Sequence, residues 1–164
     1  MEIYNRDGLR IVVDESYDAH EFLKKFNDPD MLKHTGLSFP LDETAVSSLQ
    51  ETKPDVRRFI FFKDGELAGS SDVYDLTDQK ANLRYWVAKD FQGKGVATSA
   101  ILAISNYCFK DLHLHYVQAR VDVDNVGSIR VLEKTGFYKK DLIKRSSPKK
   151  GESLGDYLYV LENE

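Results

Sequence analysis

Apolar and polar residues follow one another through the middle of the chain in a pattern that predicts an antiparallel meander. The apolar run over residues 59–62 reads as a strand, Asp64-Gly65 is a favoured hairpin turn, and residues 67–74 read as the return strand. A short polar turn then leads into a third strand over residues 81–88. Three consecutive strands joined by short turns are therefore expected in this part of the chain.

The last third of the chain carries a second set of strand signals. Apolar residues alternate strictly with polar ones over residues 117–123, which indicates a half-buried strand. Residues 137–143 and 157–161 are expected to form the closing strands. The loop between them contains residues 149–151.

Apolar residues spaced three and four apart predict helices before the meander. A short strand over residues 9–13 precedes a helix that we expect Ser16 to cap. Weaker signals place two short helices between residues 30 and 53, the second beginning near Asp42 or Thr44.

A longer helix of about four turns follows the meander. Its apolar face comprises Val96, Ala100, Ile101, Ile104, Tyr107 and Cys108. A shorter helix begins at a cap formed by Asp124 or Asn125 and ends at Gly136. Hairpin-linked strands followed by crossover helices predict an α/β fold, in which a mixed sheet carries helices on both faces.

Composition narrows the class of protein. A chain of 164 residues fits one domain, so residues 1–164 are expected to form a single unit. The formal net charge is −4 and the basic residues are scattered, which argues against nucleic acid as a partner. The first residues lack a signal-peptide core, and no run approaches the roughly 20 apolar residues of a membrane helix. We therefore expect no membrane partner and a cytoplasmic location.

The clearest chemical signal lies over residues 85–98, where the third strand leads into the long helix. A helix start presents unpaired N–H groups and the positive end of the helix dipole, which favour a phosphate. Gly93 and Gly95 let the backbone approach an anion closely, and Lys94 can add a charge. The Walker motif is absent, and the dinucleotide fingerprint fails because Thr98 stands where it needs glycine. A tight turn without a ligand explains these residues equally well.

A second polar pair stands at the start of the next helix. Asn125 and Ser128 are three residues apart and share one helix face. A plain interpretation makes Asn125 a cap and Ser128 a solvent-facing residue, although capping and ligand contact can coexist in one side chain.

Both segments resemble one family. Residues 92–97 read Gln-Gly-Lys-Gly-Val-Ala, similar to the (Gln/Arg)-x-x-Gly-x-(Gly/Ala) pyrophosphate loop of the GNAT N-acetyltransferases. Asn125 and Ser128, followed by Val-Leu-Glu-Lys-Thr-Gly-Phe at 131–137, resemble the RimJ/RimL-type branch, which acetylates protein N-termini among other amines. The resemblance spans about residues 57–162. It implies a mostly antiparallel, twisted sheet with helices on both faces, and acetyl-CoA as cosubstrate.

The resemblance also implies a cofactor site. Its residues are Trp86, Val87, Gln92, Gly93, Lys94, Gly95, Val96, Ala97, Thr98 and Asn125. Backbone amides of residues 92–98 would hold the diphosphate, and the strand edge near Trp86 and Val87 would pair with the pantetheine arm. Asn125 would hydrogen-bond the pantetheine and Ser128 would lie near the thioester sulfur. A backbone N–H near Val87 would donate to the oxyanion.

Two positions depart from the family pattern and leave the proton chemistry open. Asn82 stands where many relatives carry a glutamate, and an amide cannot act as a base. Leu132 stands where other branches carry a tyrosine acid, so Ser128 is the remaining candidate for the catalytic acid. Acidic and phenolic side chains within residues 72–75 could supply a proton path, but exposed strand or turn positions explain them equally.

Other reactive side chains have plainer explanations. Cys108 is the single cysteine and falls on an apolar helix face, so an inert buried thiol is expected rather than a covalent intermediate. No metal site is expected, because His113 and His115 have no cysteine or carboxylate cluster nearby.

The acceptor is expected to be an amine. Presenting a lysine amine neutral at pH 7 costs about 4.6 kcal/mol, whereas an α-amine costs about 1 kcal/mol. A site without an obvious carboxylate base is therefore better matched to the α-amine of a protein N-terminus or a small molecule. Acetylation of a polyamine or amino sugar, a CoA-binding domain without catalysis, and a homodimer all stay open.

Overall fold

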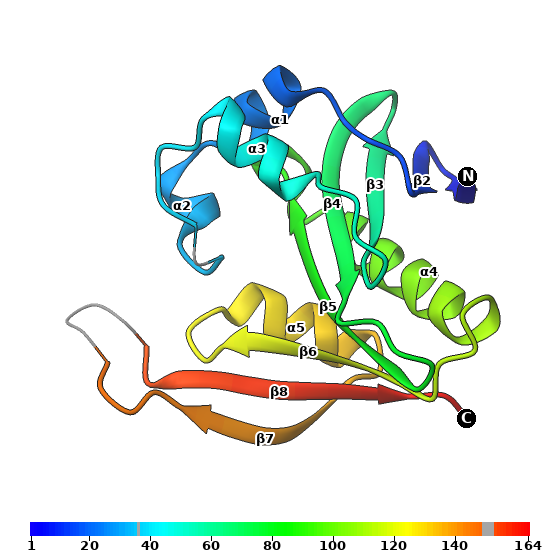
Figure 1. The fold of residues 1–164 in the computed structure, drawn as a ribbon, viewed down its shortest axis with the longest axis vertical. Coiled ribbons are helices and arrows are strands. Elements are labelled where there is room, and N and C mark those ends of the chain that lie inside the picture. Colours follow the sequence, from blue (N-terminus) through cyan, green and yellow to red (C-terminus); the bar gives the residue numbers. More distant parts are fainter. Residues whose placement is uncertain (36, 149–152) are drawn as a thin grey trace.

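The strands form one sheet in the computed structural model, which describes residues 1–35, 37–148 and 153–164 (Figure 1). They are β1 (Glu2–Arg6), β2 (Leu9–Val13), β3 (Arg57–Lys63), β4 (Glu66–Tyr74), β5 (Lys80–Val87), β6 (Tyr116–Asp122), β7 (Tyr138–Lys144) and β8 (Gly155–Glu162). Their spatial order is β1-β2-β3-β4-β5-β6-β8-β7. Neighbours are antiparallel except β5 and β6, which run parallel. The predicted mixed, mostly antiparallel sheet is confirmed.

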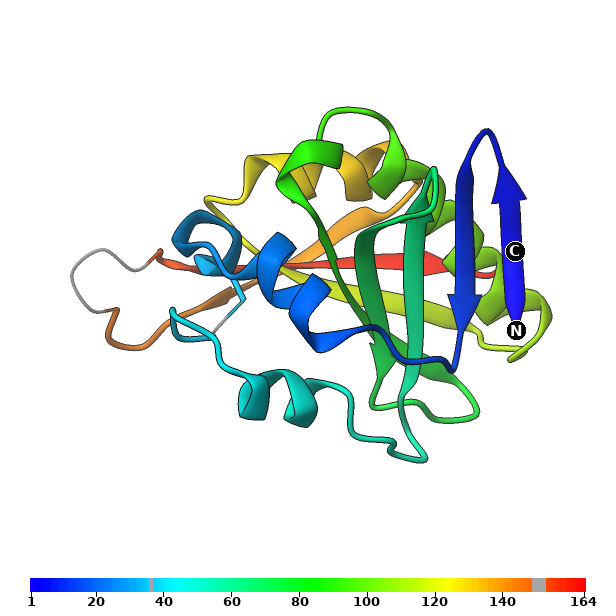
Figure 2. The same cartoon turned by 90° about the horizontal axis from the view of Figure 1, so that it is seen from above.

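Helices cover both faces of this sheet, as the sequence predicts (Figure 2). They are α1 (Ala19–Phe26), α2 (Pro29–Leu32), α3 (Glu43–Leu49), α4 (Val96–Lys110) and α5 (Val126–Lys134), with a 3₁₀ turn η1 over Lys89–Phe91. Because side chains alternate along a strand, β3 serves both layers. Phe59 and Phe61 pack in the cluster that includes α4 and α5, and Ile60 packs in the cluster that includes α1, α2 and α3.

The N-terminal hairpin is an element that the sequence patterns missed. β1 pairs antiparallel with β2, and β2 pairs with β3, so the chain begins with a strand at the sheet edge. Asp7 and Gly8 form the turn with φ angles of 53° and 80°. Asp-Gly is the same hairpin signal that residues 64–65 carry. The residues of β1 are mostly exposed, so no alternating apolar pattern marked a strand before this turn.

Aspartates cap the helices of the N-terminal layer. The prediction that Ser16 caps α1 is wrong, because Asp18 Oδ1 accepts the N–H of Glu21 at 2.9 Å. Asp42 caps α3 as predicted, and its Oδ1 accepts the N–H of Ala45 at 2.8 Å. A carboxylate at this position also suits the positive end of the helix dipole.

The long helix α4 packs across one face of the sheet with the side that the sequence predicts. Five of its six predicted residues are buried, namely Val96, Ala100, Ile101, Ile104 and Cys108. Tyr107 is partly buried and meets the ring of Phe59 edge-on, with centroids 5.5 Å apart. The helix is thereby fixed in the core, and its first residues lie beside the end of β5.

The sheet loses its pairing in the middle. β5 and β6 are paired through residues 80–82 and 116–118, and beyond them the two strands diverge (Figure 1). At the last paired position Gln118 Nε2 donates to Asn82 Oδ1 at 2.7 Å, and Asn82 Nδ2 donates to Asp75 at 3.1 Å. The Oδ1 of Asn82 therefore joins β5 to β6 where they separate, and its Nδ2 binds the turn that follows β4.

The two closing strands have a spatial order different from their order in the chain. β8 lies between β6 and β7 and pairs antiparallel with both. The predicted loop residues 149–151 lie outside the described residues. Among the helices that the structure describes, none has the length and apolar character needed to cross a membrane.

Replacing Gly69 with alanine should lower the free energy of unfolding by about 1–3 kcal/mol. A Cβ there would lie 2.3 Å from the carbonyl oxygen of Trp86 and 2.8 Å from a ring carbon of buried Phe61. Denaturant unfolding measures the loss. Gly127→Ala is the control, because its Cβ would meet nothing within 4 Å on the helix α5. That change should be neutral or stabilise by up to about 1 kcal/mol, and equal losses in the two variants would contradict this account of Gly69.

Candidate active site

A cavity of about 260 Å³ opens where β5 and β6 diverge. Its walls come from β4, β5, β6 and α5 and from residues of the N-terminal helical layer. The lining residues are His34, Thr35, Leu37, Leu49, Tyr74, Leu83, Arg84, Tyr85, Trp86, Ala119, Arg120, Val121, Asp122, Asn125, Ser128 and Leu132. This volume is below that of most sites for drug-sized ligands, so it suits the reacting ends of two molecules rather than a whole nucleotide.

The edge of β5 that faces this cavity has free backbone groups. Ala88 donates its N–H to the carbonyl of Ala68 next to β4, at 2.7 Å. Because successive residues of a strand point to opposite sides, the N–H of Val87 points toward the opening instead. β6 offers no partner there, since its pairing with β5 ends at residue 82. An extended chain that carries amides can pair with such an edge.

The start of α4 has two glycines and no side-chain cap. Gly93 and Gly95 adopt φ angles of 72° and 80°, in the left-handed region that glycine tolerates best. Gly95 is the N-cap and provides no side chain to cap the helix, so the first N–H groups of α4 stay available. Lys94 is exposed, and its Nζ lies 6.0 Å from the ring centroid of Phe91. The predicted cradle residues 92–98 thus form one turn around the helix start.

Gln92 has a structural task of its own. Its Nε2 donates to the carbonyl of Val87 at 3.0 Å and lies 3.3 Å from the sulfur of Met31. The side chain therefore ties the helix start to the end of β5 and to α2. The backbone N–H of Gln92 donates to the carbonyl of Lys89 at 3.3 Å, so this N–H is not free for the predicted cradle.

Trp86 faces the N-terminal layer. Its ring meets Phe22 and Phe26 edge-on, with centroids 5.2 and 5.7 Å away. The side chain lines the cavity and at the same time anchors α1. Its backbone N–H and C=O face β4, where Trp86 pairs with Ser70, so the open edge predicted near Trp86 and Val87 carries the N–H groups of Tyr85 and Val87.

Asn125 and Ser128 lie together on the cavity wall. Asn125 Oδ1 accepts the N–H of Ser128 at 3.2 Å, so Asn125 caps α5 as the sequence predicts. Ser128 does not simply face solvent, because its Oγ lies 2.8 Å from the hydroxyl of Tyr85. Burial raises the pKa of Tyr85, and the hydrogen bond with Ser128 offsets this only in part. Tyr85 therefore keeps its proton at neutral pH.

The sequence patterns missed Tyr85 as a site residue. It stands between Leu83 and Val87 on the strand face that turns toward α4 and α5. That alternation could have placed the ring on the inner face, but its hydroxyl partner is 43 residues away in the chain.

Comparison with known proteins assigns the chain to a family. The chain matches the family model described as an acetyltransferase (GNAT) domain over residues 8–138. It belongs to the GNAT family of acetyl-CoA-dependent N-acetyltransferases.

Relatives of this GNAT chain include several from Bacillus subtilis. It is 37% identical over 143 residues to the uncharacterized N-acetyltransferase YnaD, a match that covers 84% of each chain. It is 37% identical over 79 residues to the putative ribosomal N-acetyltransferase YdaF, a match that covers 47% of this chain and 43% of that protein. The chain spans about half the length of YdaF and of a second relative, the probable N-acetyltransferase YjcK from Bacillus subtilis.

A solved GNAT structure shares the whole architecture. The spermidine N-acetyltransferase from Vibrio cholerae, in complex with CoA and spermine, superposes with a TM-score of 0.83. The match covers 96% of both chains at 18% sequence identity, a likeness of fold.

The two departures from the GNAT pattern have structural explanations here. Asn82 is committed to its two amide contacts at the strand divergence. Leu132 is buried in the core and also lines the cavity. Asp72, one of the suggested proton carriers, lies 3.4 Å from Arg58 and 3.1 Å from Arg84 and so belongs to an ion-pair cluster on the sheet.

Cys108 is fully buried in the core of the GNAT domain. Burial raises the pKa of its thiol to about 12, so the thiolate needed for covalent catalysis does not form at neutral pH.

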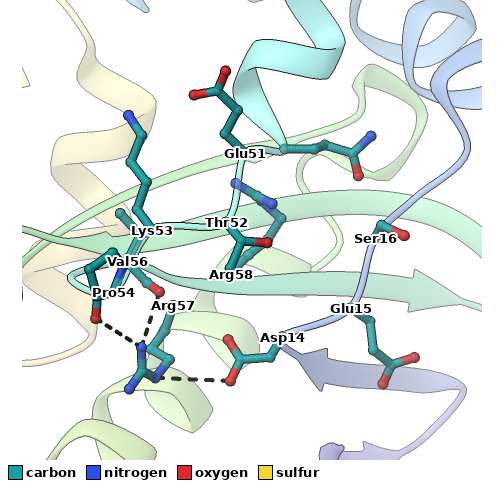
Figure 3. Close-up of a pocket in the computed structure, with 11 residues that line it drawn as sticks. Asp14, Glu15, Ser16, Glu51, Thr52, Lys53, Pro54, Val56, Arg57 and Arg58 are labelled. Carbon is teal, nitrogen blue, oxygen red and sulfur yellow. Dashed lines mark hydrogen bonds and ion pairs between the residues drawn. The ribbon is translucent and has the colours of Figure 1, made fainter.

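A larger hollow of about 1000 Å³ lies elsewhere, between the β2–α1 connection and the α3–β3 connection (Figure 3). Arg57 crosses it, 3.9 Å from Asp14 and hydrogen-bonded to the carbonyls of Pro54 and Val56. This larger hollow shares no lining residue with the β5–β6 cavity, and its lining includes neither the free edge of β5 nor the start of α4. The smaller cavity is therefore the candidate active site of this GNAT chain.

Gly95→Val should weaken acetyl-CoA binding by at least about tenfold, because a branched side chain at φ 80° disturbs the helix start and fills the approach of the diphosphate. Isothermal titration calorimetry measures the dissociation constant. Gly65→Val is the matched control, since Gly65 has φ 84° in the β3–β4 turn, away from the cavity. An unchanged affinity in Gly95→Val, or equal losses in both variants, would contradict a cradle at residues 92–98.

Proposed function

We propose that this chain transfers the acetyl group of acetyl-CoA to the α-amine of a protein N-terminus or of a small molecule. The observation that carries the proposal is the cavity beside the free edge of β5, with the Tyr85–Ser128 pair on one wall and no carboxylate at position 82. An α-amine fits this arrangement because it needs about 1 kcal/mol to become neutral at pH 7.

The described residues fit the parts of the cosubstrate. The N–H groups at residues 93–98 would bind the diphosphate, and the edge of β5 would pair with the amides of the pantetheine arm. Asn125 uses Oδ1 as a helix cap, which leaves its Nδ2 to donate to a pantetheine carbonyl. The adenine end would remain outside, since the cavity holds about 260 Å³.

Three groups would assist the transfer. When bound, acetyl-CoA supplies an acyl group activated as a thioester. The N–H of Val87 would donate to the carbonyl oxygen as negative charge develops on it. With the Tyr85 hydroxyl donating to Ser128 Oγ, the hydrogen of Ser128 can point at the departing sulfur and stabilise the thiolate.

The charge of the cavity favours an α-amine over a polyamine. Arg84 on β5 and Arg120 on β6 line it and are ion-paired with Asp72 and Asp156, which lie outside the lining, whereas Asp122 is the one carboxylate among the lining residues. A polyamine carries several positive charges and would find a single lining carboxylate to pair with here. The name of YdaF, a putative ribosomal N-acetyltransferase, supports a protein N-terminus, whereas the spermine in the Vibrio cholerae complex supports the alternative.

An amine panel should separate these acceptors. A peptide with a free N-terminus should react faster at pH 7 than the same peptide with a blocked N-terminus and a free lysine, by on the order of 10²-fold in kcat/KM. Release of free CoA thiol measures the rate, and spermidine is the third arm. Faster turnover of lysine or spermidine would contradict the α-amine assignment. Acetyl-CoA binding without turnover of any amine would show a binding domain instead.

Ser128→Ala should lower kcat by on the order of 10²-fold with little change in acetyl-CoA affinity, because the leaving thiolate loses its hydrogen-bond donor. Tyr85→Phe should give a smaller loss, since it removes the partner of Ser128 and not the group beside the sulfur. Ser105→Ala is the matched control, because Ser105 is buried away from the cavity and no described residue hydrogen-bonds its Oγ. Normal turnover in Ser128→Ala would remove Ser128 from the mechanism.

A further inference from the structure

We propose that His34, oriented by Asp122, is the base that takes the proton from the acceptor amine. The inference rests on the function proposed above and supplies the proton acceptor that Asn82 cannot provide. It assigns a catalytic role to the segment after α2 and a positioning role to the end of β6.

His34 lines the cavity from the side of the N-terminal layer. Its Nδ1 lies 3.5 Å from Asp122 Oδ2, and the two side chains are 23% and 14% exposed. In this pairing Nδ1 carries the hydrogen that faces the carboxylate, so Nε2 keeps the lone pair that accepts a proton. No hydrogen bond to Nε2 is found in the part of the chain that the structure describes.

Asp122 is held as a carboxylate. It ends β6 beyond the point where pairing with β5 stops. Burial alone would raise its pKa, but hydrogen bonds from the N–H of Asp124 and from Ser153, together with His34, outweigh burial and lower it. A fixed negative charge beside an imidazole orients the ring and stabilises the imidazolium form.

The other polar groups around His34 are poor proton acceptors. Arg84 and Arg120 line the same cavity and keep their protons under all working conditions. Arg145 lies 3.7 Å from Asp122 and 3.8 Å from Asp156 and adds to the same charge cluster.

The two lining tyrosines do not compete for the role either. The guanidinium of Arg84 lies over the ring of Tyr74, and the Arg84 Cζ is 4.6 Å from the centroid of that ring. Burial raises the pKa of Tyr85, which therefore stays protonated. Among the described lining residues, His34 carries the side chain type that exchanges a proton near neutral pH.

The proton balance of the reaction then closes. The acceptor enters as R–NH3+, and Nε2 of His34 accepts one proton, so that the neutral amine can form the C–N bond with the acetyl carbonyl carbon. The C–S bond breaks and its electron pair leaves on sulfur. As the amide forms, nitrogen loses a second proton, which ends on the thiolate and gives the CoA thiol, and the proton on Nε2 returns to solvent.

The pH dependence of His34→Gln provides the test. With a free-N-terminus peptide, kcat/KM should fall by on the order of 10²-fold at pH 7. The loss should shrink toward pH 9, because an α-amine is then already neutral and needs no base. Acetyl-CoA affinity, measured by calorimetry, should stay within about twofold of the wild type, and added imidazole should partly restore turnover to His34→Ala.

A matched control separates this role from a structural one. His20 also pairs with a carboxylate, Glu43 at 3.3 Å, but both lie exposed on the surface outside the cavity. His20→Gln should leave the whole pH profile unchanged. Asp122→Asn should lower kcat and leave KM for the peptide within about twofold, since the carboxylate that orients Nδ1 of His34 is lost.

Each outcome decides between the proposals. An active wild type with an unchanged profile in His34→Gln, or with an equal loss at every pH and no imidazole rescue, would overturn His34 as the base and leave the acetyltransfer proposal standing. A wild type that acetylates no amine in the panel would overturn both.

Discussion

The divergence of β5 and β6 is the constraint on which the rest of the site depends. A sheet normally pairs the N–H and C=O groups of its inner strands by hydrogen bonds. Each buried group left without a partner costs about 1–3 kcal/mol. Here the Asn82–Gln118 contact marks the last pairing, and the backbone of β5 beyond it faces a cavity. An amide-bearing arm laid along this edge, as we propose for pantetheine, would recover those hydrogen bonds.

Neighbouring residues of β5 connect the opening to different layers. Tyr85 turns toward α5 and meets Ser128, whereas Trp86 turns toward α1 and packs on Phe22 and Phe26. The next residue, Val87, carries the free N–H at the open edge. The two helical layers therefore fix the same short piece of strand from opposite sides, and a shift in either one would move the groups proposed for catalysis.

Local patterns were enough to predict most of the fold. The meander, the apolar face of α4 and the cap at Asn125 follow from periodicity and capping rules, and the family follows from residues 92–97 and 125–137. The contacts that shape the cavity could not be read in this way. The Tyr85–Ser128 bond and the His34–Asp122 pair join distant segments, and nothing local distinguishes their members from ordinary surface or core residues. The roles assigned to the site residues stay predictions.

The position of Trp86 has a practical consequence, because it is the chain's one tryptophan. Its indole lines the cavity and touches two phenylalanines of α1, so tryptophan emission originates from a single place on the cavity wall. Indole fluorescence responds to solvent exposure and to polar neighbours. The protein thus carries a built-in optical probe, and its spectrum should register occupation of the cleft without any label.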